Sequence, residues 1–191
     1  MRTVVLRASV WLFASMSSPL VAQVPSFDPD DGNASFEAMA EYLARDGGRW
    51  RSDNPNYDPN RVNSPPAFGL WFTRALNGRV LDLRIVVHYA DSTVVSSEGQ
   101  WAWHPGESRL TYRMVGRNGS LTEGTTDFER PSTFTTVTTA YSRRGNASVH
   151  RDDNVLVDDS LHRNETFRRN TDGSWTSEGV YEWRRSKHEP D

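Results

Sequence analysis

Cysteine is absent from the 191 residues of this chain. Disulfide bonds, thiolate metal sites, a cysteine nucleophile and a cysteine-linked lipid anchor are therefore excluded. Stability has to come from side-chain packing and backbone hydrogen bonds, and a chain of this length can bury a sufficient core in one domain.

Net charge is also low, at −3 formally at pH 7, with an isoelectric point near 6.0. This balance gives no electrostatic reason to expect nucleic acid or an anionic membrane as a partner. Lysine is nearly missing, because Lys187 is the sole lysine among 22 basic residues. The arginines are scattered rather than clustered, which indicates a compositional bias more than a phosphate site.

Long apolar runs do not occur either. The most apolar stretch near the start covers residues 8–14, follows Arg2 and Arg7, and precedes small residues around Ala22. It is shorter than the roughly 18 residues that a membrane span requires. The pattern predicts a signal peptide over residues 1–22, and hence an exported protein, periplasmic or secreted, without a membrane span after cleavage.

Familiar catalytic motifs are missing: the chain has no Gly-x-Ser-x-Gly elbow, His-Glu-x-x-His pair, phosphate loop or dinucleotide fingerprint. None of the five histidines is paired at a metal-ligand spacing, so we expect no metal and no cofactor. His88 and His104 are expected at the surface. His162 lies near Glu165, and two interpretations stay open: an acid–base set inside a barrel, or a solvated strand histidine.

Aromatic residues, in contrast, are abundant. The chain has seven Trp, eight Phe and six Tyr, although its mean hydropathy is −0.70. Solvated, disordered chains are poor in aromatics, so this composition indicates a folded domain.

Period-two alternation is the main structural signal. From Val80 to Trp103, two strand-like runs flank the polar break at residues 90–93, and each run has an apolar face, which predicts a β-hairpin. Similar short runs follow, with turn signals such as Asn77-Gly78 and Asn118-Gly119 at nearly regular spacing. We therefore expect an all-β fold, an antiparallel up-and-down barrel of about ten strands. Glu98 and Glu123 become interior carboxylates if the assignment of faces is reversed.

One short helix precedes the strands. Apolar residues recur at helical spacing between Phe36 and Leu43, Asn33 or Ser35 can cap the N-terminus, and the glycines at 47 and 48 end the helix. The predicted organisation is a lead-in and helix over residues 23–47, a barrel over 48–186 and a polar tail over 187–191.

Two short motifs at the ends of the predicted barrel carry a resemblance. Gly48-Arg49-Trp50 opens the first strand, and Tyr181-Glu182-Trp183-Arg184-Arg185 closes the last, after Asp172-Gly173-Ser174-Trp175. The chain resembles the lipocalin-like (calycin) barrels, most closely a set of bacterial exported lipocalin-like domains of unknown function. The resemblance implies that Trp50 fills the closed end, with Arg184 or Arg185 packed over it. The related haem-binding barrels have a longer Gly-rich opening where this chain has residues 51–54, so haem is not expected.

The expected function is binding of a small hydrophobic or aromatic molecule inside the barrel. The candidate lining residues are Leu83, Ile85, Val87, Tyr89, Trp101, Trp103, Tyr112 and Met114. Two alternatives stay open. The barrel is an enzyme that uses interior Glu, His or Arg for acid–base chemistry, or it is a dry structural module that binds a partner through an exposed aromatic patch around Trp71. The oligomeric state is left open.

Overall fold

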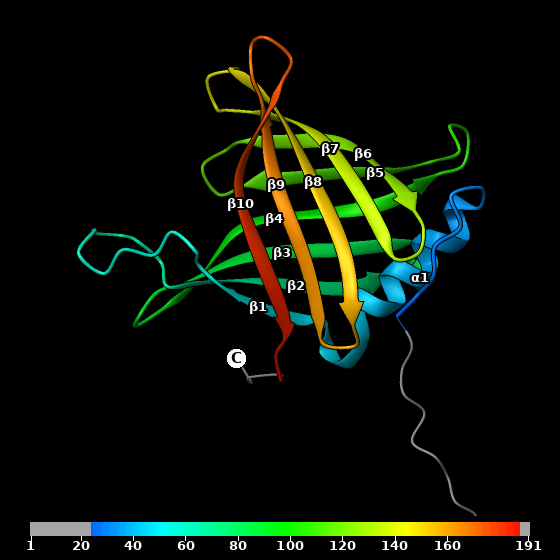
Figure 1. Ribbon diagram of the computed structural model, residues 1–191, viewed down its shortest axis with the longest axis horizontal. Coiled ribbons are helices and arrows are strands. Elements are labelled where there is room, and N and C mark those ends of the chain that lie inside the picture. Colours follow the sequence, from blue (N-terminus) through cyan, green and yellow to red (C-terminus); the bar gives the residue numbers. More distant parts are fainter. Residues whose placement is uncertain (1–23, 188–191) are drawn as a thin grey trace, which may run out of the picture.

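A computed structural model describes residues 24–187 of the chain (Figure 1). The predicted signal peptide, and residues 188–191 of the predicted tail, lie outside the described residues. The helix and strands are α1 (Gly32–Ala44), β1 (Arg49–Asp53), β2 (Ala67–Ala75), β3 (Val80–His88), β4 (Thr93–His104), β5 (Arg109–Gly116), β6 (Leu121–Glu129), β7 (Thr133–Tyr141), β8 (Ala147–Asp158), β9 (Leu161–Arg169) and β10 (Trp175–Arg185). Short 3-10 turns follow α1 and β2, at Arg45–Gly47 and Leu76–Gly78.

The ten strands form one closed antiparallel barrel in which each strand pairs with the next along the chain. β1 closes the circle against β10, with Trp50 opposite Arg185. The predicted fold class is confirmed. Closure pairs the backbone groups that an open sheet would leave exposed at its edges.

Helix α1 packs at one end of the barrel, beside the ends of β5 and β6 (Figure 1). Its buried face includes Phe36, Met39 and Leu43, as the helical spacing predicts. The N-cap is Asp31, whose carboxylate accepts a hydrogen bond from the Ala34 N–H; the predicted caps Asn33 and Ser35 were wrong. The helix covers this end of the barrel with apolar side chains. No helix of residues 24–187 covers the other end, which we call the open end (Figure 1).

Among residues 24–187, no helix combines the length and the apolar character that a membrane crossing needs.

The closed end is built on Trp50, whose side chain is almost completely buried. Its indole Nε1 donates a hydrogen bond to the Leu43 carbonyl oxygen at 2.9 Å, which ties β1 to the end of α1. Of the two arginines left open by the sequence, Arg185 is the one over the indole ring. Arg184 is exposed instead and pairs with Glu182 at 3.0 Å.

Candidate functional site: an interior cavity with one polar wall

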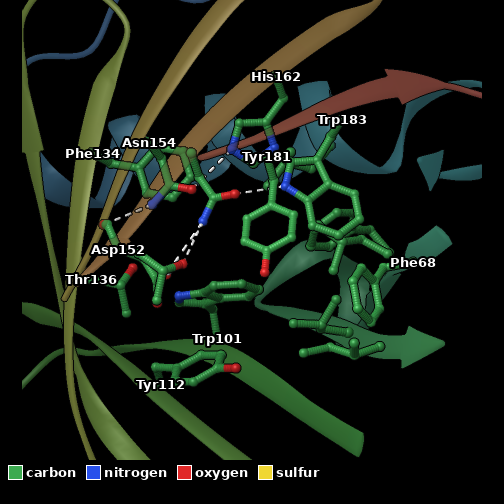
Figure 2. Close-up of a pocket in the computed structure, with 17 residues that line it drawn as sticks. Phe68, Trp101, Tyr112, Phe134, Thr136, Asp152, Asn154, His162, Tyr181 and Trp183 are labelled. Carbon is green, nitrogen blue, oxygen red and sulfur yellow. Dashed lines mark hydrogen bonds between the residues drawn. The ribbon is translucent and has the colours of Figure 1, made fainter. Parts of the chain in front are cut away.

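The barrel interior contains a cavity of about 260 Å³ between an apolar wall and a polar wall (Figure 2). The apolar side is formed by Leu43, Phe68, Leu70, Phe72, Leu83, Ile85, Trp101, Tyr112 and Phe134. The polar side is formed by Thr136, Asp152, Asn154, His162, Asn164 and Thr166, and Tyr181 and Trp183 complete the lining. A ligand here would meet aromatic surface on one side and hydrogen-bonding groups on the other.

The polar wall exists because β8 and β9 turn their polar face inward. On β8, Asp152 and Asn154 line the cavity, whereas Val155 and Val157 lie on the outside and are 41% and 48% exposed. This is the reverse of the usual pattern for a barrel with an apolar interior. Burying polar side chains while exposing valines lowers stability, and such reversals are expected at functional sites.

Asp152 is the centre of the polar wall. Its Oδ1 accepts hydrogen bonds from Thr166 Oγ1 at 2.6 Å and from Asn164 Nδ2 at 3.3 Å. No described residue donates a hydrogen bond to its Oδ2. Burial raises the pKa of this carboxyl group, and the hydrogen bond from Thr166 and the charge of His150 oppose that rise. Asp152 Oδ2 is therefore a hydrogen-bond acceptor in the cavity that has no donor among the described residues.

Asn164 and Trp183 extend this network toward β10. The Trp183 indole Nε1 donates to Asn164 Oδ1 at 2.7 Å, while Asn164 Nδ2 donates to Asp152. Because both ends of the Asn164 amide are engaged, the side chain has one orientation, and the Trp183 ring is fixed beside the cavity.

His162 forms the inner end of the polar wall. Asn154 Nδ2 donates to the Asp152 carbonyl, so Asn154 Oδ1 is left to accept from His162 Nε2 at 2.9 Å. The proton of the neutral imidazole is thereby assigned to Nε2. Its Nδ1 is buried without a described hydrogen-bond partner. Burial lowers the pKa of His162 to about 3.

Of the two interpretations of His162, the interior location is confirmed, whereas the solvated histidine and the pairing with Glu165 were wrong. The residue is 3% exposed, so it is not a solvated histidine. Glu165 belongs to the opposite face of β9, where it accepts a hydrogen bond from Ser177 Oγ at 2.7 Å, so the two residues form no acid–base set. Glu98 and Glu123 are likewise outside the barrel, in ion pairs with Arg84 and Arg113.

Half of the predicted lining residues border the cavity. Leu83, Ile85, Trp101 and Tyr112 do so, and the other four do not: Val87, Tyr89, Trp103 and Met114. Trp103 lies at the closed end, so close to Gly32 that a Cβ atom added there would come within 2.8 Å of the indole ring. Tyr89 lies past the end of β3, in the hairpin loop.

Val87 and Met114 lie nearer the open end than the cavity residues of their strands. A register shift follows Ile85, the last residue of β3 that lines the cavity, and Val87 lies beyond it. Met114 is partly buried, and its sulfur accepts a hydrogen bond from the Tyr112 hydroxyl at 3.1 Å. Met114 therefore contributes packing rather than cavity surface.

A second polar cluster lies in the first half of β8, before Asp152. Ser148 Oγ is 2.8 Å from His150 Nε2, and His150 Nδ1 is 3.3 Å from a carboxylate oxygen of Glu178. The other carboxylate oxygen of Glu178 is 3.4 Å from Arg168 Nε. Glu178 is the additional residue of a β-bulge in β10. We call Ser148, His150, Arg168 and Glu178 the mouth cluster.

Among the described residues, no group of three or more His, Cys, Asp or Glu side chains could hold a metal ion. Neither a protein-family model nor a curated protein matches this chain. The class of protein is therefore defined by its architecture: a closed ten-stranded antiparallel barrel, compatible with a calycin-like fold.

Proposed function

We propose that this protein is an exported, lipocalin-like barrel that binds a small hydrophobic or aromatic molecule in its interior. The observation that carries the proposal is the cavity of about 260 Å³. Ligand pockets usually range over about 300–1,000 Å³, so a cavity of this size suits a small aromatic ligand.

The apolar wall supports the proposal because its rings are held in place without a ligand. The Trp101 ring lies 4.7 Å from the Tyr112 ring and 6.1 Å from the Phe72 ring, between centroids. Trp101 Nε1 donates to Thr126 Oγ1 at 3.0 Å, so its polar atom is already satisfied. A pre-ordered aromatic surface lowers the entropy that binding has to overcome.

Export and lipocalin-like character are supported by separate features. The charged, then apolar, then small-residue pattern of residues 1–22 supports export. The packing of Arg185 over Trp50 supports the lipocalin-like assignment, since the resemblance implies such a pair.

An apolar fluorescent probe tests the binding proposal. We expect N-phenylnaphthylamine to increase its emission with the wild-type protein. The substitution Ile85→Trp places a larger ring in the cavity and should weaken binding at least about tenfold, or 1.4 kcal/mol. The control Val115→Trp enlarges a side chain that is 54% exposed and should leave binding unchanged. A wild-type protein that binds neither this probe nor related apolar compounds would overturn the proposal in favour of the dry barrel.

Hydrolysis is a second candidate function, favoured by the mouth cluster. The order Ser148, His150, Glu178 repeats the nucleophile, base and orienting carboxylate of acyl-transfer enzymes. Ser148 Oγ would attack an ester carbonyl, His150 would pass the hydroxyl proton to the departing alcohol, and water would then release the acid. The test is turnover of p-nitrophenyl butyrate: Ser148→Ala should abolish it, and Ser142→Ala, in the exposed loop, should not.

The partner-binding alternative is weakened by the surroundings of Trp71. The Arg49 guanidinium lies 3.8 Å from the Trp71 ring centroid and covers one face of the ring. This contact reduces the exposed aromatic patch that such a module would need.

A further inference from the structure

Asp152 is the one acidic residue among the described residues that line the cavity. None of the described residues that line the cavity is a lysine or an arginine. His162 is neutral because burial lowers its pKa to about 3, and burial raises the pKa of both Tyr112 and Tyr181. Asp152 is the remaining ionisable residue of the lining.

The hydrogen bonds of Asp152 leave its second oxygen available to a ligand. Thr166 and Asn164 both donate to Oδ1, and Oδ2 receives no hydrogen bond from any described residue. A carboxylate in such a place is poorly solvated, and it gains most from a partner that brings both a donor and a positive charge.

Among the described residues, no cation supplies that partner inside the cavity. Arg168 and His150, the bases of the mouth cluster, both face Glu178, and His150 also contacts Ser148. The adjacent carboxylate, Asp153, pairs with Arg151 at 3.0 Å. The nearby basic residues are therefore engaged by other acidic groups.

The rings of the lining suit a cation as well. Tyr181 stacks on Trp183 with a centroid separation of 5.9 Å, and Phe68 meets Tyr181 edge-on at 6.0 Å. Figure 2 shows the Tyr181 side chain extending toward Trp101, in the space between Asp152 and Phe68. Aromatic faces carry negative electrostatic potential and attract ammonium groups.

We propose that the cavity selects a small apolar amine, whose ammonium group binds Asp152 Oδ2 and whose hydrocarbon body lies against the aromatic wall. This inference rests on the proposed binding function and adds the chemical class of the ligand. A neutral alcohol of the same shape would make a weaker hydrogen bond, and a carboxylate of the same shape would be repelled.

Calorimetric titration with three matched probes tests the selection: phenethylamine, phenethyl alcohol and hydrocinnamate. For the wild-type protein near neutral pH we expect the amine to bind about tenfold more tightly than the alcohol, and hydrocinnamate most weakly, since charge-assisted hydrogen bonds are roughly twice as strong as neutral ones. Asp152→Asn should remove the preference for the amine, so that the amine binds no more tightly than the alcohol. The control Asp127→Asn changes an exposed carboxylate and should leave all three affinities unaltered.

The outcomes separate the two proposals. Equal binding of amine and alcohol by the wild-type protein overturns cation selection and leaves cavity binding intact. Failure of all three probes, together with failure of N-phenylnaphthylamine, overturns binding itself. The comparison within the wild-type protein needs no variant, so the inference stays testable even if Asp152→Asn does not fold.

Discussion

The guanidinium carbon of Arg185 lies 4.1 Å from the centroid of the Trp50 ring, across the strand pair that closes the barrel. Arg185 also donates to three backbone carbonyls, those of Tyr42, Arg45 and Asp159, at 2.6 to 3.0 Å. Tyr42 lies in the last turn of α1, and Arg45 begins the 3-10 turn that follows it. Asp159 belongs to the turn between β8 and β9. One side chain thus joins α1, β1, β10 and a hairpin at the closed end.

Replacing this arginine should destabilise the barrel. We expect Arg185→Ala to lower the free energy of unfolding by about 2–4 kcal/mol, because three carbonyls lose a charged donor and Trp50 loses its cation. Arg184→Ala removes an exposed side chain and should change the free energy of unfolding by less than about 0.5 kcal/mol. Urea denaturation measures both. Equal effects would contradict the distinction between the two arginines.

Gly48 provides a second matched comparison at the same end. Its φ is +64°, and a Cβ atom added there would lie 2.1 Å from the Phe72 carbonyl oxygen. Gly47 has φ +88° with nothing within 4 Å of its added Cβ. Gly47→Ala should cost about 1–2 kcal/mol from the left-handed backbone alone. Gly48→Ala should cost clearly more, measured by thermal unfolding, because the strand also has to move.

His162 should make stability fall in acid. Its folded pKa of about 3 is below the unfolded value of 6.5, so between these values the unfolded chain binds a proton that the native protein does not. The free energy of unfolding should therefore decrease as pH falls through this window, by up to about 1.4 kcal/mol per pH unit from this group. His162→Gln should flatten the profile. His104→Gln, at an exposed site, should retain the wild-type slope.

Asp152 should affect the pH dependence of stability in the opposite direction to His162. Burial raises its folded pKa above 3.8, so over the pH range just above 3.8 the native protein keeps a proton that the unfolded chain releases. The contribution of Asp152 to stability is present below pH 3.8 and is lost as pH rises through the folded pKa. Asp152→Asn should therefore stabilise the ligand-free protein at pH 7, by about 1–3 kcal/mol. A destabilised variant would show that the carboxylate is satisfied within the protein.

The barrel and helix α1 could be predicted from the sequence because the sequence patterns that indicate them are local. Alternation around Val80 to Trp103 and the helical spacing after Phe36 each depend on a few neighbouring residues. The choice between Arg184 and Arg185 could not be made, since it depends on the register between β1 and β10, which are far apart in the chain.

The polar wall was missed for a physical reason. Assigning apolar residues to the interior works for β3 and β4, but on β8 it would turn Val155 and Val157 inward and Asp152 outward. Glu178 was missed because a β-bulge changes the alternation of β10, and a bulge has no fixed sequence signal. The sequence did contain one clue to the polar wall, namely polar residues that repeat at period two. They are Asp152 and Asn154 on β8, and His162 and Asn164 on β9.

Native mass spectrometry of the protein purified from its own host, beside denatured spectra of the same sample, tests the central claim most directly. The account predicts an additional small mass that is present in the native spectrum, lost on denaturation and absent from the Ile85→Trp variant. A bare native mass, repeated after exposure to lipid extracts and to apolar amines, would contradict the claim that the barrel is a binding protein.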